Sequence, residues 1–248
     1  MSRPAIRARG LGKRFRIGTR EGRRTLLSAL RHNLTGASAH RDLWALRGLD
    51  VDVERGEIFG VVGSNGAGKS TLLLLLAGIL APTEGTLDVQ GKTDPFFQFA
   101  AALRPELAVK DNIALCAALL GIPDRQLKRR FDRIVEFSGL SDFLYARYGE
   151  LSTGMAARLP FAVAVHADLD IILVDEMLSV GDRAFQQKCL ETFRALSREG
   201  KTLVVVSHDL NLIGELCGRA VLLERGRAAY CGPAAEAAAR ALAIPAPR

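Results

Sequence analysis

The chain has 248 residues, of which 48% are hydrophobic and 25% charged, as expected of a globular protein with one well-filled core. Its longest apolar run, residues 72–80, is far shorter than the ~18 residues that a membrane-spanning helix needs. The first residues, MSRPAIRARG, lack the apolar centre of a signal peptide, so we expect a cytosolic chain. The cysteines show no paired spacing and are predicted to be reduced, buried and small apolar side chains: Cys116, Cys189, Cys217 and Cys231.

Basic side chains are concentrated near the N-terminus. Residues 1–47 contain twelve Lys and Arg but two acidic residues, a net charge of +10, which leaves −3 for the remainder of the +7 total. Such a region could face anionic lipid, nucleic acid or simply water. No aromatic residues are interleaved as in a single-strand nucleic-acid groove, so membrane proximity ranks above nucleic acid.

In chain order, strands alternate with helices, which predicts an α/β fold with a mainly parallel sheet. An edge strand over 5–17, with Leu11, Phe15 and Ile17 as its apolar members, precedes a basic insertion over 18–43 that could hold a short helix at 26–34. The residues between 100 and 150 have helical character, and the alanine-rich tail, 234–248, starts as a helix. Further strands are predicted at 49–53, 58–62, 86–89, 171–174 and 203–206, a closing hairpin at 220–231, and helices after residues 71 and 184.

The stretch Gly63–Thr71, GSNGAGKST, matches the phosphate-loop pattern G-x-x-x-x-G-K-[ST] at every fixed position. A buried strand precedes it and a helix follows it, so backbone N–H groups and the helix N-terminus can converge on a polyphosphate. Glycines are expected there because a Cβ would block that approach. A glycine-rich turn without a ligand is the weaker alternative. The predicted contacts are Gly63, Ser64, Asn65, Gly66, Ala67, Gly68, Lys69, Ser70 and Thr71, with Lys69 on the outer phosphates and Ser70 on Mg²⁺.

Two further motifs follow buried strands. In DIILVDE, Asp175 is predicted to help hold Mg²⁺, and Glu176 to orient or deprotonate the attacking water. The alternative is an acidic pair that caps the next helix. His208, in the sequence SHD, could contact a γ-phosphate or the attacking water, although a lone histidine is more often structural or exposed.

A fourth motif, LSTGM at 151–155, is typical of a helix start. Ser152 is the predicted N-cap, and the free N–H groups after it form an anion site. The spacing does not say which anion would bind there.

Together GSNGAGKST, LSTGM, DIILVDE, SVGD and SHD, in this order and spacing, resemble the nucleotide-binding subunit of an ABC transporter. The resemblance covers about residues 5–232. Within that superfamily the sequence is similar to those of the exporters of O-antigen, capsule and teichoic acid. It implies one ABC domain over 1–248, with an N-terminal antiparallel β part and a helical signature subdomain at about 100–160.

The resemblance also implies roles for particular residues. Phe15 would stack on adenine, Gln98 would meet Mg²⁺ and the permease, and His208 would act as the switch histidine. Asp182 would lie at the subunit interface. The signature residues would contact the ATP of the other subunit: Ser152, Thr153, Gly154 and Met155.

Three features qualify this resemblance. The signature is LSTGM rather than the commoner LSGGQ, although methionine is usual in the polysaccharide group. Pro160, inside the signature helix, is predicted to remove one hydrogen bond and bend it. Some family members carry an additional C-terminal glycan-binding domain; the sequence ends at residue 248, so we expect recognition of the cargo to lie elsewhere.

The sequence therefore predicts an ATP- and Mg²⁺-dependent ATPase that works as a homodimer under a polytopic permease. It would lie peripherally at the cytoplasmic face of the inner membrane, export a lipid-linked polysaccharide and bind no nucleic acid. The alternatives are an exporter of a lipid or drug and a soluble ABC ATPase that acts on ribosomes or DNA. Soluble translation types usually carry two cassettes and DNA-repair types a long coiled coil, and neither feature is found in the sequence.

Overall fold

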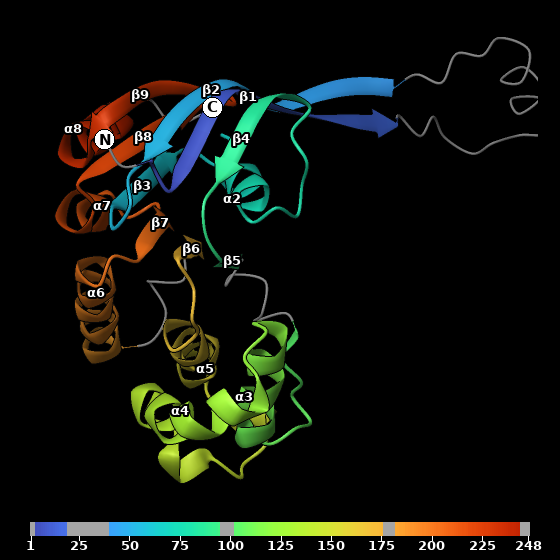
Figure 1. The fold of residues 1–248 in the computed structure, drawn as a ribbon, viewed down its shortest axis with the longest axis vertical. Coiled ribbons are helices and arrows are strands. Elements are labelled where there is room, and N and C mark those ends of the chain that lie inside the picture. The colour runs from blue at the N-terminus through green and yellow to red at the C-terminus, as the bar shows by residue number, and fades with distance from the viewer. Residues whose placement is uncertain (1–2, 19–39, 95–101, 176–181, 244–248) are drawn as a thin grey trace, which may run out of the picture.

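The computed structural model describes residues 3–18, 40–94, 102–175 and 182–243 (Figure 1). Its centre is a six-stranded sheet in the order β5-β6-β7-β3-β8-β9, parallel throughout except for the antiparallel pair β8–β9. The strands are β3 (Ile58–Gly63), β5 (Thr93–Asp94), β6 (Ile171–Asp175), β7 (Thr202–Val206), β8 (Arg219–Glu224) and β9 (Arg227–Pro233).

The inner strands are apolar at successive positions because both faces of the sheet are covered. On β6, Ile172 and Val174 belong to one buried cluster, whereas Ile171 and Leu173 belong to the other. The same alternation occurs on β3, β7 and β8. Strands buried on both faces are typical of α/β proteins, so the predicted fold class is confirmed.

A second sheet, in the order β2-β1-β4, is antiparallel and covers one face of the core. It consists of β1 (Ile6–Gly18), β2 (His40–Val53) and β4 (Glu84–Val89). The prediction that β1 is an edge strand was wrong, because β4 pairs with its first half and places β1 in the centre. Residues 40–43 belong to β2 rather than to the insertion, and 19–39 lie outside the described residues.

Beyond Gly12 the strands β1 and β2 continue as a two-stranded hairpin that projects from the body (Figure 1). Its pairing with β4 stops at Gly12 and Glu84. Ile17, predicted as an apolar member of this strand, is 47% exposed, and among the described strands only β2 pairs with this part of β1.

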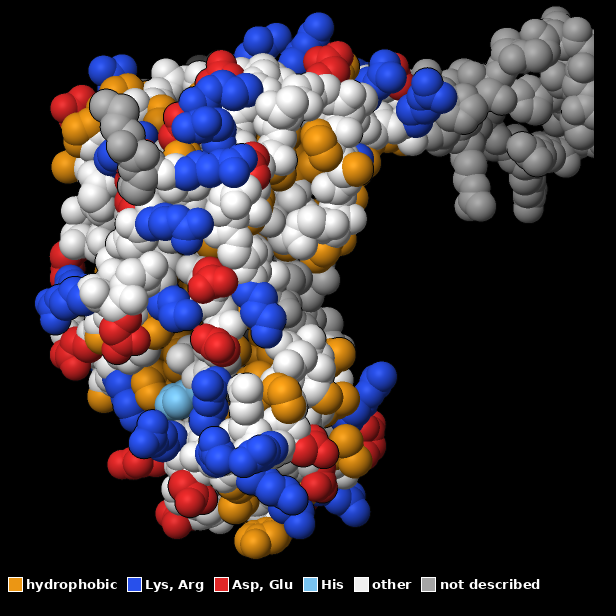
Figure 2. Space-filling model, viewed as in Figure 1, with side chains coloured by type: hydrophobic (Ala, Val, Ile, Leu, Met, Phe, Trp, Pro, Cys, Tyr) orange, Lys and Arg blue, Asp and Glu red, His pale blue; other side chains and the backbone are white. Residues whose placement is uncertain are grey.

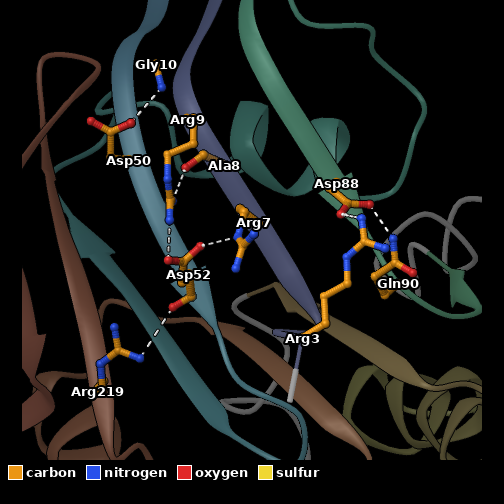
Figure 3. Close-up of polar contacts among 10 residues, drawn as sticks. All are labelled: Arg3, Arg7, Ala8, Arg9, Gly10, Asp50, Asp52, Asp88, Gln90 and Arg219. Atoms are coloured by element: carbon orange, nitrogen blue, oxygen red, sulfur yellow. Dashed lines mark hydrogen bonds and ion pairs between the residues drawn. The ribbon is translucent and has the colours of Figure 1, made fainter. Parts of the chain in front are cut away.

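Polar contacts join the two sheets (Figure 3). Asp52 on β2 accepts a hydrogen bond from Arg9 and pairs with Arg7, and Arg219 on β8 donates to the Asp52 carbonyl at 3.3 Å. Arg3 pairs with Asp88 on β4 at 2.7 Å. Arg3, Arg7 and Arg9 therefore have acidic partners within the chain, and the face in Figure 2 shows basic and acidic side chains interspersed.

Helices cover both faces of the central sheet and form a separate helical part (Figure 1). The helix α2 contributes to the cluster shared with the antiparallel sheet, while α6, α7 and α8 contribute to the opposite cluster. The helical part consists of α3, α4 and α5. Within the described chain no helix is long and apolar enough to cross a membrane. The helices are α2 (Lys69–Leu76), α3 (Val109–Leu119), α4 (Asp124–Ser138), α5 (Thr153–Val165), α6 (Arg183–Arg198), α7 (Leu210–Leu216) and α8 (Ala234–Leu242).

The cysteines are free, as predicted, but they are not all buried. Burial raises the pKa of Cys116, Cys189 and Cys217 to about 12, so these thiols are inert. Cys231 is exposed because it lies on β9, the outer strand of the sheet.

Candidate ATP-binding site

The phosphate loop, Asp175 and His208 follow three neighbouring parallel strands. In register, Val206 of β7 pairs with Val61 of β3 and with Asp175 of β6. The carboxyl ends of β3, β7 and β6 therefore lie side by side, which is where open α/β sheets bind ligands. The structure brings these motifs together although about a hundred residues of sequence separate the first from the others.

Two of the loop glycines, Gly63 and Gly68, lie too close to the rest of the protein for a side chain. A Cβ at Gly63 would lie 2.3 Å from the Leu223 carbonyl oxygen, and one at Gly68 would lie 2.5 Å from that of Ala45. Both glycines have positive φ angles, 147° and 107°. At these two positions a side chain would first collide with β8 and β2, so glycine allows the loop to pack closely on its own protein.

Lys69 is positioned to hold a polyphosphate. It is the first residue of α2 and is 7% exposed, and its Nζ donates to the carbonyls of Gly63 at 2.8 Å and Ser64 at 3.2 Å. The first turn of α2 contains no acidic residue, and no side chain caps it. Its N–H groups and positive end are therefore available to an anion.

The remaining side chains at this edge suit Mg²⁺ and water. Asp175 is half-buried at the end of β6, and Ser70 is exposed on the first turn of α2. No three His, Cys, Asp or Glu side chains cluster as a metal site in the described chain. Magnesium is commonly held by one or two carboxylates together with substrate phosphates, so a hydroxyl and a single carboxylate fit it.

His208 is exposed, and its two neighbours, Ser207 and Asp209, have structural roles. The Asp209 carboxylate caps α7 by accepting from the N–H groups of Asn211 and Leu212, and the Ser207 hydroxyl accepts from the Asp209 N–H. Glu176 and Gln98 lie outside the described residues.

The alternative that the acidic pair Asp175–Glu176 caps the next helix falls partly outside the described residues, which resume at Asp182, the N-cap of α6. Its carboxylate accepts from the Phe185 N–H at 2.8 Å and pairs with Arg158 of α5 at 2.9 Å. The Phe185 N–H and then the Arg158 guanidinium hold the pKa of Asp182 below its usual range.

The signature residues begin α5, as predicted. The Ser152 hydroxyl accepts from the Met155 N–H at 3.3 Å, which makes it the N-cap. Ser152 and Thr153 are exposed, while Gly154 and Met155 are half-buried. The helix α5 lies in the helical part, away from α2 and the phosphate loop (Figure 1). One chain therefore does not bring the two anion sites together.

The structure shows how α5 accommodates Pro160. Proline lacks the N–H that would bond to the carbonyl of Ala156, four residues earlier. The hydroxyl of Tyr148 donates to that carbonyl at 3.0 Å, and α5 continues to Val165. Burial raises the pKa of Tyr148, so the hydroxyl stays protonated as a donor.

Two half-buried aromatic residues of the β1–β2 hairpin have cationic neighbours. Phe15 is half-buried, with the Lys13 ammonium 5.6 Å from its ring centroid. Trp44 has two arginine neighbours, Arg14 at 5.5 Å and Arg47 at 4.9 Å from the ring centroid. The adenine contact of Phe15 stays a prediction.

Comparison with solved structures identifies the class of fold. A dimeric ATP-binding cassette in a post-hydrolysis state bound to ADP and Pi has a TM-score of 0.74 and 21% identity, covering 92% of this chain and 98% of that one. The match shows that the chain has the fold of an ATP-binding cassette.

The ABC transporter family model matches residues 46–179, more than half of the sequence, and the chain belongs to that family. It is 36% identical over 242 residues to the O-antigen export system ATP-binding protein RfbB of Myxococcus xanthus, covering 96% of this chain and 55% of that one. It is 42% identical over 183 residues to the teichoic acids export ATP-binding protein TagH of Levilactobacillus brevis, covering 74% and 50%. The chain thus spans about half the length of these two relatives, whose names agree with the predicted polysaccharide group.

Proposed function

We propose that this chain is the ATP-hydrolysing subunit of an exporter of a lipid-linked polysaccharide, peripheral to the cytoplasmic face of the membrane. The observation that carries the proposal is the arrangement of the phosphate loop, Asp175 and His208 at one sheet edge, with a capped signature helix elsewhere on the same chain. The relatives named for O-antigen and teichoic-acid export support the class of cargo.

The separation of α5 from the phosphate loop supports a head-to-tail pair of subunits. Each ATP would lie between the loop of one copy and Ser152–Met155 of the other. Asp182, exposed at the start of α6, would contribute to the interface between the copies. Closure of this pair would be driven by contacts that ATP makes and ADP does not.

Within each site the loop N–H groups and Lys69 would bind the β- and γ-phosphates. Glu176 would orient or deprotonate the attacking water, and His208 would contact the γ-phosphate or that water. Magnesium, when bound, would neutralise phosphate charge, and the residues that would hold it are Ser70, Asp175 and Gln98. Loss of the γ-phosphate contacts would then release the partner.

The test is a chromosomal Lys69→Ala variant in the cell that makes this protein. We expect surface polysaccharide to disappear and lipid-linked glycan to accumulate inside, because flux through the exporter depends on ATP. Protein abundance and copurification with a polytopic membrane protein serve as controls. Normal surface glycan at normal protein abundance would refute the cargo.

Two alternatives give different results in the same experiments. An exporter of a lipid or drug would leave the glycan unchanged but alter that other cargo. A soluble ATPase that acts on ribosomes or DNA would not copurify with a membrane protein, and nucleic acid would stimulate its ATPase activity.

A further inference from the structure

The turn between β8 and β9 lies against the phosphate loop. The Gly226 N–H donates to the Ala67 carbonyl at 3.1 Å, and the Gly226 carbonyl accepts from the N–H of Arg47 on β2 at 2.8 Å. We propose that Gly226 is a positioning residue for ATP binding. Its two backbone hydrogen bonds form a clasp between the phosphate loop and β2, and this clasp holds the loop in the conformation that binds ATP. The proposal rests on the ATP binding proposed above and adds to it a residue far along the sequence.

The phosphate loop needs such support because of how it binds. Its N–H groups converge on the anion, so its carbonyls point outward and require other donors. The Lys69 ammonium serves the carbonyls of Gly63 and Ser64. The Ala67 carbonyl, in the middle of the loop, receives the Gly226 N–H from the β8–β9 turn. Without this donor, the carbonyl of Ala67, which is a buried residue, would need another hydrogen-bond donor.

The fit of the turn allows no side chain at residue 226. A Cβ there would lie 2.7 Å from the Ala45 carbonyl oxygen and 3.0 Å from its carbonyl carbon. The same oxygen would lie 2.5 Å from a Cβ on Gly68 in the loop. The Ala45 carbonyl of β2 therefore leaves no room for a side chain at either Gly68 in the loop or Gly226 in the turn. Backbone atoms cannot move aside as a flexible side chain can. A side chain at 226 would push the turn away from Ala67.

The conformation of the turn supports the same conclusion. Glu224 pairs with Arg227, so the loop of the hairpin has two residues, and both have positive φ angles, 47° at Arg225 and 78° at Gly226. Arg225 is the single non-glycine residue with positive φ in the part of the chain that the structure describes. Two-residue hairpins of this kind favour Asn or Gly, which makes Arg225 an unfavourable choice for the first position. Strained positions of this kind concentrate at functional sites.

The experiment compares Gly226→Ala with Gly200→Ala in the full chain. Gly200 also has a positive φ, 86°, but a Cβ there would meet nothing within 4 Å. The control therefore carries the backbone strain without the collision. Isothermal titration with Mg-ATP should show at least about tenfold weaker binding for Gly226→Ala, and less than about twofold change for Gly200→Ala. Equal affinities of the two folded variants would overturn the proposal.

A second arm covers the case in which Gly226→Ala folds poorly. Arg225→Asn relaxes the turn and should keep wild-type affinity, so Gly226→Ala is also made in that background. In the unmodified protein, ATP should slow hydrogen exchange at the Gly226 amide, because the coupling between clasp and ligand is reciprocal. Unchanged exchange at residues 225–227 with ATP bound would refute the clasp. Failure of the wild-type protein to bind Mg-ATP would instead refute the proposed function.

Discussion

At the residue scale, Lys69 and Asp52 show that burial influences whether a charge acts on ligand affinity or on stability. Lys69 is 7% exposed and donates to two loop carbonyls, so its ammonium is held where phosphate would bind. Asp52 also has specific partners, but it lies in a partly exposed cluster of arginines (Figure 3). We therefore expect the first charge to act on ligand affinity and the second on stability.

Lys69→Ala should weaken ATP binding by about 10- to 100-fold, because it removes a charge-assisted hydrogen bond at a partly desolvated site. The affinity is measured by titration of the purified chain. Lys128→Ala, which removes an exposed charge on α4, is the control and should bind ATP normally. Unchanged affinity of Lys69→Ala would count against the phosphate cradle.

Asp52 predicts a pH dependence of stability. The hydrogen bond from Arg9 holds the pKa of Asp52 below its usual value of 3.8. A carboxyl whose pKa is lower in the folded state stabilises the fold above the unfolded pKa, and this stabilisation is lost as the pH falls through the folded pKa.

Urea unfolding of wild type and Asp52→Asn should therefore show a less stable variant at neutral pH, with the difference shrinking below about pH 4. High salt should reduce the difference at neutral pH, since the groups are partly exposed. A difference independent of pH would exclude the ion pairs as its cause.

At the element scale, α5 depends on a donor from outside the helix. Tyr148→Phe should cost about 1 kcal/mol of stability, because the Ala156 carbonyl loses its hydrogen bond. In a Pro160→Ala background the new N–H can bond to Ala156, so the same substitution should cost less. A double-mutant cycle by chemical denaturation measures the coupling. Additive effects would show that Tyr148 does not compensate for the proline.

At the scale of the whole molecule, the phosphate loop and the signature helix α5 lie apart within one chain (Figure 1). Glu176→Gln should keep ATP binding, lower turnover by at least about 100-fold and accumulate an ATP-bound dimer. Size-exclusion chromatography with ATP tests the dimer, and ADP, which lacks the γ-phosphate, provides the monomer control. Near-normal hydrolysis would refute the role of Glu176, and a persistent monomer would refute the shared site.

Much of the site could be predicted from the sequence because its chemistry is local. A phosphate loop needs its glycines, lysine and hydroxyl at fixed spacing between one strand and one helix, and Ser152 caps α5 from three residues away. Strands that are buried on both faces can also be recognised in the sequence as continuous apolar runs, as in β6 and β7.

The tertiary structure decided what depends on partners distant in sequence. The position of β1 between β2 and β4, the exposure of Cys231 and the donor that Tyr148 supplies to α5 all arise from pairing or packing that no local pattern records. Arg225–Gly226 could be predicted as a turn, but its contact with Ala67 could not, because backbone carbonyls carry no sequence signal. The sequence by itself thus determined the residues of the predicted phosphate site, and the tertiary structure determined which distant residues contact them.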